Sequence, residues 1–464
     1  MVEGDSAYPY WPEGRRRKAF IFLVACLGAG AMPHLLGPIR GLFPALGAAL
    51  LFGGYSLRSM LSPRHQIEEP FNGLVSEALS SNAVANSVVN ALAKAVANDQ
   101  LPRVDVLVAA RDEEAVITRL VQAVADLDYP KELLSLWVMD DGSLDRTPQI
   151  LEKLAEQFPF LEVRRRPRDA GGGKSAALNA LLPQLQGEWL MVLDADASFD
   201  PNLLLRLAPH LKLRQWGALQ LRKAVEQADS SWLTRSQALE MAFDAVIQEG
   251  RIASGGIGEL RGNGELLRRE VLLACGGFNE DTVTDDLDLS FRLLLAGEAI
   301  GVVWNPPVQE EPVTRWGALL RQRQRWAEGG LQRYLDYWPA LISAKLSIAQ
   351  KFDLFVFFVL QYMLPVAIYG DLFAAVVWRQ LPLLWPLSIS TLSLSAFALR
   401  QAGKRPSDGP ALPSSTGLTL LMANTYLMHW FLVIPWVSLR MALKPKRLIW
   451  SKTTHVGLAV PGLP

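Results

Sequence analysis

The chain has 464 residues, and its 46 Lys and Arg residues balance 46 Asp and Glu residues. This zero net charge argues against a protein that binds nucleic acid through bulk positive charge. Half of the residues are hydrophobic and 20% are charged, so the chain is richer in apolar residues than an ordinary soluble domain and long enough for two or three domains.

Two apolar segments without Lys, Arg, Asp or Glu lie near the N-terminus, at 19–36 and 42–57. A membrane-spanning helix needs about 20 mostly apolar residues, so we expect a transmembrane hairpin within 1–64. A signal peptide is the alternative for the first segment, but no small-residue cleavage site leads into a polar chain. RRRK at 15–18 precedes the hairpin, which predicts that the N-terminus and the following domain are cytoplasmic.

The central part, 98–340, has the charge density of a water-soluble domain. It follows an alanine- and valine-rich linker at 65–97, and we expect this linker to form an amphipathic helix against the membrane. Short apolar runs at its beginning alternate with segments of helical spacing. The runs predict strands at 104–110, 133–139, 161–166 and 188–193. This alternation predicts an α/β domain with a mostly parallel sheet, which binds ligands beyond the C-terminal ends of its strands.

Acidic loops follow three of these strands and supply the candidates Glu113, Asp141, Asp194 and Asp196. Asp194 and Asp196, two residues apart on a turn, can hold Mg²⁺ or Mn²⁺ and leave positions for substrate phosphates. Asp141, in DDGS, can accept hydrogen bonds from a base or from ribose hydroxyls. Each loop alone fits an ordinary turn equally well, because Asp is common in turns.

The stretch GGGKSAALN, at 171–179, resembles a phosphate-binding P-loop, but Arg168 stands where that motif requires its first glycine. The loop follows a predicted strand and opens a helix at the same edge of the sheet. Lys174 is therefore compatible with binding a nucleotide diphosphate without the geometry of a P-loop.

Five acidic residues lie within 280–288, ahead of an apolar helical pattern. Some of them can simply favour a helix N-terminus. Packing like charges so closely is costly unless a cation or an electrophilic substrate is near. Asp286 is therefore a candidate general base toward a hydroxyl group.

The segment QRQRW, at 322–326, combines arginine with tryptophan. It fits an interfacial membrane helix, in which Arg reaches lipid head groups and Trp lies in the aromatic belt. It also fits a site where guanidinium and indole groups hold a pyrophosphate and a sugar ring.

The C-terminal part, 341–464, contains three further long apolar segments, at 352–378, 382–399 and 414–439. They predict about three more spans. KPKR at 444–447 conflicts with the positive-inside rule if all three cross the membrane. Either the last segment is a tight hairpin or an interfacial helix, or the count of spans is off by one.

The order AARDEE, DDGS, GGGKSAALN, DAD, GNGELLRR, TDDLDL and QRQRW resembles the membrane-bound family 2 glycosyltransferases of the GT-A fold. The resemblance covers roughly 98–330. Cellulose, chitin and hyaluronan synthases belong to that group, as do several enzymes that glycosylate lipids. The resemblance implies inverting transfer of a sugar from a nucleotide sugar, usually a UDP-sugar, with Mg²⁺ or Mn²⁺.

The resemblance also implies roles on the donor side. Asp141 and Glu113 would contact the uridine with Lys174 nearby, Asp196 would bind the metal, and Asp194 would contact the ribose or phosphate. The first loop reads AARDEE where the family more often has a Pro-x-Tyr-Asn-Glu form, which puts the role of Glu113 in doubt.

On the acceptor side, Asp286 would be the base, in TDD where many members have TED. Gln322, Arg325 and Trp326 match the Q-x-x-R-W signature and would hold the diphosphate and the acceptor-side sugar.

In layout the chain is most similar to the cyanobacterial members that transfer glucose from UDP-glucose to diacylglycerol, which implies a multi-pass protein of the plasma or thylakoid membrane. Ceramide glucosyltransferases have a similar layout. A processive polysaccharide synthase is a further alternative, although it usually has more spans. A non-catalytic scaffold would lack a use for these carboxylates.

Overall fold

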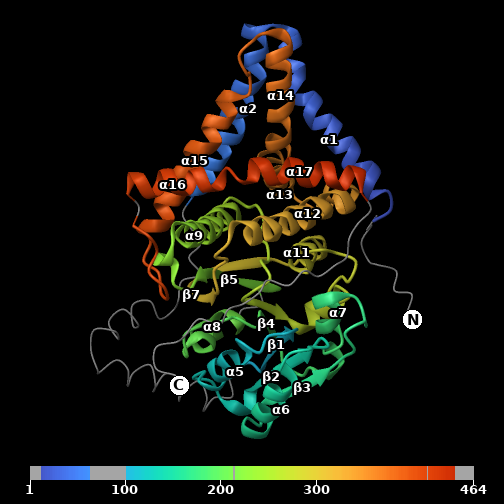
Figure 1. The fold of residues 1–464 in the computed structure, drawn as a ribbon, viewed down its shortest axis with the longest axis vertical. Helices are drawn as coiled ribbons and strands as arrows, with labels where there is room; N and C mark the ends of the chain where they lie inside the picture. Colours follow the sequence, from blue (N-terminus) through green and yellow to red (C-terminus); the bar gives the residue numbers. More distant parts are fainter. Residues whose placement is uncertain (1–11, 63–100, 213–214, 415, 445–464) are drawn as a thin grey trace.

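The structure, a computed structural model, describes residues 12–62, 101–212, 215–414 and 416–444. Figure 1 shows a sheet domain at one end, a layer of crossing helices above it, and further helices that converge at the other end. The helix expected at 65–97 lies outside the described residues, as does all of KPKR except Lys444.

Seven strands form one mixed sheet in the order β3-β2-β1-β4-β6-β5-β7. The strands are β1 (Val104–Ala110), β2 (Leu134–Asp140), β3 (Leu161–Arg165), β4 (Trp189–Leu193), β5 (Ala218–Val225), β6 (Glu265–Arg268) and β7 (Ile300–Glu310). Only β6 runs antiparallel to its neighbours within this sheet. The four predicted strands are confirmed as β1 to β4, and the mostly parallel α/β fold is confirmed.

Helices cover both faces of the sheet. Successive residues of β1 face opposite sides, so Val106 and Val108 pack with one set of helices while Leu107 packs with the other. The first set is α5 (Ile117–Ala125), α6 (Thr147–Gln157) and α8 (Leu203–Lys212). The second set is α7 (Gly173–Asn179), α10 (Arg269–Ala274) and α11 (Asp285–Ala296). Short helical turns complete the domain: η2 (Lys131–Leu133), η3 (Leu182–Gln184) and η4 (Ala228–Ser230).

Above the sheet, long helices cross the molecule and others run to the far end (Figure 1). The crossing helices are α9 (Trp232–Ala253), α12 (Trp316–Leu341), α16 (Gly417–Leu427) and α17 (Trp430–Leu443). The helices that run to the far end are α1 (Arg15–Ala31), α2 (Pro38–Leu61), α14 (Leu364–Trp378) and α15 (Trp385–Lys404). The turn η1 (Met32–Leu36) joins α1 to α2, and α13 (Ile348–Phe358) enters α14 through a π-helical turn, η5 (Val359–Met363). α1 packs against α14, and α2 packs against α15.

Among the described residues, three helical segments are long and apolar enough to cross a membrane: Arg15–Leu36, Ile348–Trp378 and Gly417–Leu443. The segments predicted at 42–57 and 382–399 fall in α2 and α15, which are not among these three, so their crossing stays a prediction. Leu50 and Val376 are 77% and 79% exposed. Such exposed apolar surface is typical of helices that contact lipid.

A buried ion-pair network joins these helices to the sheet domain. Arg251 of α9 binds Asp353 of α13 at 2.9 Å, and the hydroxyl of Tyr55 of α2 donates to the same carboxylate at 3.0 Å. Arg251 also contacts Glu259, which binds Arg333 of α12 at 3.0 Å. Removing one partner of a buried pair leaves an uncompensated charge, so this network fixes how the helices sit on the domain.

Candidate active site

A cavity of about 150 Å³ lies where the C-terminal ends of the parallel strands meet α11 and α12. β1 pairs in parallel with both β2 and β4, so the loops after these strands reach the same edge of the sheet. Eight of the nine predicted site residues line the cavity: Glu113, Lys174, Asp194, Asp196, Asp286, Gln322, Arg325 and Trp326. The contacts of these residues with a donor stay a prediction.

Asp194 and Asp196 lie directly after β4. Lys174, in the first turn of α7, donates to Oδ1 of Asp194 at 2.6 Å and to the carbonyl oxygen of Gly262 at 3.2 Å. Oδ2 of Asp196 accepts from the backbone N–H of Glu311 at 2.9 Å. Burial, reinforced by the nearby carboxylates of Asp194 and Glu310, raises the pKa of Asp196 to about 8. The protonated form of Asp196 is therefore favoured more than that of an exposed Asp in the absence of a bound cation.

Asp286 lies in the first turn of α11. A Cβ atom placed on Gly262, whose φ is +87°, would lie 3.3 Å from Oδ2 of Asp286, so this loop needs glycine both for its backbone conformation and for its approach to the carboxylate. Burial raises the pKa of Asp286, and the neighbouring charge of Asp285 raises it further. A carboxylate with a raised pKa is better matched to accept a proton near neutral pH.

The QRQRW segment is part of α12, and its residues make two different kinds of contact. Gln322, Arg325 and Trp326 line the cavity. Arg323 is fully buried outside it, where it donates to Glu240 of α9 and, at 3.2 Å, to the hydroxyl of Tyr426 of α16. Its guanidinium group also lies 4.0 Å from the ring centre of Trp326. Arg323 thus fixes α12 and the Trp326 ring, while Arg325 is available to a ligand.

Asp141 is the predicted site residue that does not line the cavity. Its buried carboxylate accepts from Nη1 of Arg111 at 3.2 Å and from Nε of Arg166 at 2.5 Å. Arg166 also donates to the carbonyl oxygens of Gly171 and Gly173 in the glycine-rich loop, at 2.6 and 3.2 Å. Asp141 therefore holds two basic residues beside the cavity, and its contact with a uridine stays a prediction.

Four residues that the sequence did not indicate as site residues also line this cavity: Lys223, Arg261, Glu310 and Glu311. Lys223 of β5 binds Glu310 of β7 at 2.7 Å. A lysine inside a buried apolar strand was the available signal, because such a residue needs a charged partner. Glu265 of β6 was also missed; it accepts from the N–H of Gly262 at 2.6 Å, and burial together with Asp286 raises its pKa.

The cavity holds a surplus of negative charge, because seven carboxylate side chains and four Lys and Arg side chains line it. A diphosphate would be repelled here unless a divalent cation entered with it. Hard carboxylate oxygens, such as those of Asp196, suit Mg²⁺ or Mn²⁺. Within the described residues, however, no three Asp, Glu, His or Cys side chains are placed to hold a metal by themselves. The residues therefore fit a metal ion that shares its coordination with a diphosphate.

Comparisons with known proteins agree with this geometry. The profile of the family described as "Glycosyltransferase like family 2" matches residues 102–329. The chain is 47% identical to the beta-monoglucosyldiacylglycerol synthase of a Synechocystis species over 363 residues, which are 76% of this chain and 75% of the relative. It is 38% identical to the synthase of the same name from Trichormus variabilis over 458 residues, which are 98% and 92% of the two chains.

A mannosyltransferase from Pyrobaculum calidifontis, solved in complex with GDP-Man and Mn²⁺, has a similar fold. The TM-score is 0.54 at 19% identity, and the match covers 92% of this chain and 99% of that one. At this identity the likeness shows the fold alone, a GT-A-like mixed sheet.

Arg323 and Arg325 of α12 are expected to differ in their effect on stability. Arg323→Ala leaves Glu240 buried without its cation, which should cost about 3–5 kcal/mol in the free energy of unfolding. Arg325→Ala, two residues along the same helix, removes a group at the cavity wall and should leave the unfolding free energy nearly unchanged. Thermal unfolding of both variants in detergent measures the difference. Equal melting temperatures would contradict the division of roles within QRQRW.

Proposed function

The chain belongs to glycosyltransferase family 2, and we propose that it transfers glucose from UDP-glucose to diacylglycerol with inversion, giving β-monoglucosyldiacylglycerol. The observation that carries this proposal is the convergence, in one cavity, of the loop after β4, the first turn of α11 and the QRQRW face of α12. The donor and the acceptor are supported by the names of the two cyanobacterial relatives.

In the proposed reaction the Asp286 carboxylate accepts the proton of the diacylglycerol hydroxyl group. The acceptor oxygen attacks the anomeric carbon on the face opposite UDP, and the bond from that carbon to the phosphate oxygen breaks with its electron pair on UDP. One displacement inverts the α-linked sugar to a β-glucoside, so no covalent enzyme intermediate is needed. Arg325 and Lys174 stabilise the charge that grows on the leaving diphosphate.

Asp196, with Asp194 beside it, would hold the divalent cation, Mg²⁺ or Mn²⁺. The cation, when bound, neutralises charge on the diphosphate and so makes UDP a better leaving group. Glu113 and Asp141 are proposed to face the uridine, and Gln322 and Trp326 the sugar and diphosphate.

We place the sheet domain on the cytoplasmic side, because the basic residues at 15–18 and Arg58 lie at the domain ends of α1 and α2. The helices that run to the far end of the molecule lie on the far side of the crossing helices from the sheet (Figure 1), and we propose that the lipid acceptor approaches Asp286 from that side.

A product analysis tests the proposal. Membranes that contain the protein are incubated with radiolabelled UDP-glucose and diacylglycerol, and the lipids are then separated from polymer. We expect label in one glucolipid, and Asp286→Asn should lower that label at least about 100-fold because a general base is lost. Asp281→Asn, a matched charge change outside the cavity, should retain activity. Label found only in a polymer, or no label unless another sugar donor is added, would contradict the proposal.

The pH dependence of the rate should reflect the raised pKa of Asp286. The base works only when deprotonated, so the rate falls as pH falls through its pKa, at a higher pH than the ordinary Asp value of about 4. Asp285→Asn removes a neighbouring negative charge and should move this acidic limb to lower pH. The measurement is kcat between pH 4.5 and 8 at saturating donor and metal. An unchanged limb in Asp285→Asn would contradict the assignment.

Metal binding should depend on Asp196. Changes to outer-shell partners weaken metal sites by about 10–100-fold, so loss of a ligand in Asp196→Asn should weaken Mn²⁺ binding at least about tenfold in the presence of UDP. Calorimetric titration with Mn²⁺ measures this, and Asp281→Asn again serves as the matched control. Unaltered affinity in Asp196→Asn would place the cation elsewhere.

A further inference from the structure

A second cavity, of about 330 Å³, continues from the catalytic cavity into the helical layers. The two cavities share the wall residues Lys223, Arg261, Thr284, Asp286 and Trp326. The carboxylate proposed as the base therefore lies where the two spaces meet. The Asp194–Asp196 loop lines only the first cavity.

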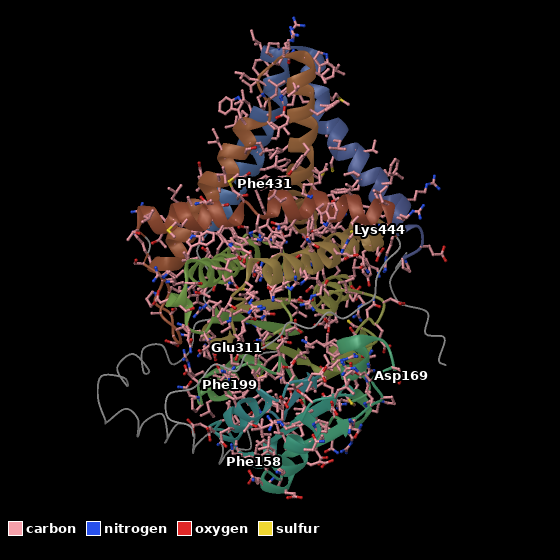
Figure 2. The ribbon with its side chains drawn as sticks, in the orientation of Figure 1. Phe158, Asp169, Phe199, Glu311, Phe431 and Lys444 are labelled. Carbon is pink, nitrogen blue, oxygen red and sulfur yellow. The ribbon has the colours of Figure 1, made fainter. Side chains whose placement is uncertain are left out.

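The remaining wall of the second cavity comes from the crossing helices and from those that run to the far end of the molecule. Apolar side chains dominate it, among them Phe243 of α9, Leu360 of η5, Leu394 of α15 and Phe431 of α17. In Figure 2 Phe431 lies where the converging helices meet the crossing layer, while Glu311, which lines only the catalytic cavity, lies at the level of the sheet. The second cavity thus extends from the active site toward the part of the molecule with exposed apolar helices.

Thr284 places a hydroxyl group without a partner at the junction. The residue is 7% exposed, and its Oγ1 atom has no hydrogen-bond partner among the described residues. α12 passes so closely that a Cβ atom on Gly329 would lie 2.0 Å from this oxygen. A buried hydroxyl left without a hydrogen bond is destabilising, and a ligand oxygen at the junction would satisfy it.

Farther along the same cavity, the amide oxygen of Asn424 is also buried without a hydrogen-bond partner, although its Nδ2 donates to the carbonyl oxygen of Leu420 at 3.1 Å. Arg251 and Asp353 of this wall pair with each other. Thr284 and Asn424 each place an uncharged polar atom there that has no hydrogen-bond partner among the described residues, which suits a ligand with a few polar groups near one end. A polysaccharide presents hydroxyl groups along its whole length, and those that face the apolar side chains of this wall would remain unsatisfied.

We infer that this second cavity is the acceptor site, in which a neutral two-chain glycerolipid places its glycerol between Thr284 and Asp286 and its acyl chains between α9, α15 and α17. The inference rests on the proposed function, and it adds the path of the acceptor and the residues that select it. The free hydroxyl of the lipid meets Asp286, and an ester oxygen meets Thr284. The size of the cavity is within the range of about 300–1,000 Å³ that is usual for ligand sites.

Two serines of α15 give a matched test. Ser395 lines the cavity and is half-buried, whereas Ser393, two residues earlier, is exposed and does not line it. Ser395→Phe should fill the path of the acyl chains and raise the KM for dioleoylglycerol about tenfold, which corresponds to about 1.4 kcal/mol of binding. The KM for UDP-glucose and the melting temperature should stay as in the wild type. Ser393→Phe should change none of these values.

Three further measurements separate the acceptor site from general damage to the fold. Ser395→Phe should be less impaired with a dihexanoylglycerol acceptor, whose chains are too short to reach α15. Thr284→Val should raise the KM for either acceptor, and Thr284→Ser should restore it because the hydroxyl returns. A diacylglycerol with a photoreactive acyl chain should label peptides of α15 or α17 in the wild-type protein.

The outcomes distinguish the two proposals. Suppose that the wild type makes glucosyldiacylglycerol but that Ser395→Phe and Ser393→Phe both have the wild-type KM for dioleoylglycerol. The assignment of the acceptor site is then wrong, while the proposed function stands. The same conclusion follows if the photoreactive lipid labels neither α15 nor α17. If the wild type makes no glucosyldiacylglycerol, the proposed function itself fails, and the acceptor site fails with it.

Discussion

Carboxylates of like charge are packed at one edge of the sheet, and they stay there because lysine and arginine side chains lie among them. Lys174 holds Asp194, and Lys223 holds Glu310. Asp196 lies next to both of these acids, and its pKa is raised by burial and by their charge. The acidic side chains that line the cavity still outnumber the Lys and Arg side chains. A cavity of this kind favours a ligand that brings positive charge with it, as a metal-bound diphosphate does.

This charge cluster depends on contacts far from the cavity. α12 carries Arg325 and Trp326 to the site, and α12 is itself held by the buried pair of Arg323 and Glu240. The helical layers are joined to one another by the buried contacts of Asp353 with Arg251 and Tyr55. Because these links are buried and directional, the position of the helices and the geometry of the active site are coupled. An enzyme that joins a water-soluble donor to a membrane lipid needs that coupling.

The sequence predicted the local features well and the long-range ones poorly. Strands β1 to β4 and the loops after them follow from hydrophobic runs that end in turn residues, and the parallel pairing then brings those loops together. Lys223 of β5, Glu265 of β6 and Arg261 in the loop before β6 were missed because these strands join the sheet through pairings distant in sequence.

QRQRW was identified as a unit, yet only the packing of α12 separates Arg323, which is buried in an ion pair, from Arg325 at the cavity. The last apolar segment shows a similar limit, because its composition suits a membrane span while Figure 1 shows α16 and α17 lying across the base of the converging helices. That placement favours the interfacial alternative for this segment.

An experimental structure of the detergent-solubilised protein with UDP and Mn²⁺ tests the central claim most directly. The claim predicts an anomalous manganese peak beside Asp196, with the diphosphate between Lys174 and Arg325 and an open path from its terminal phosphate to Asp286. A manganese peak away from Asp196, or a nucleotide bound outside the cavity shared by these residues, would contradict it.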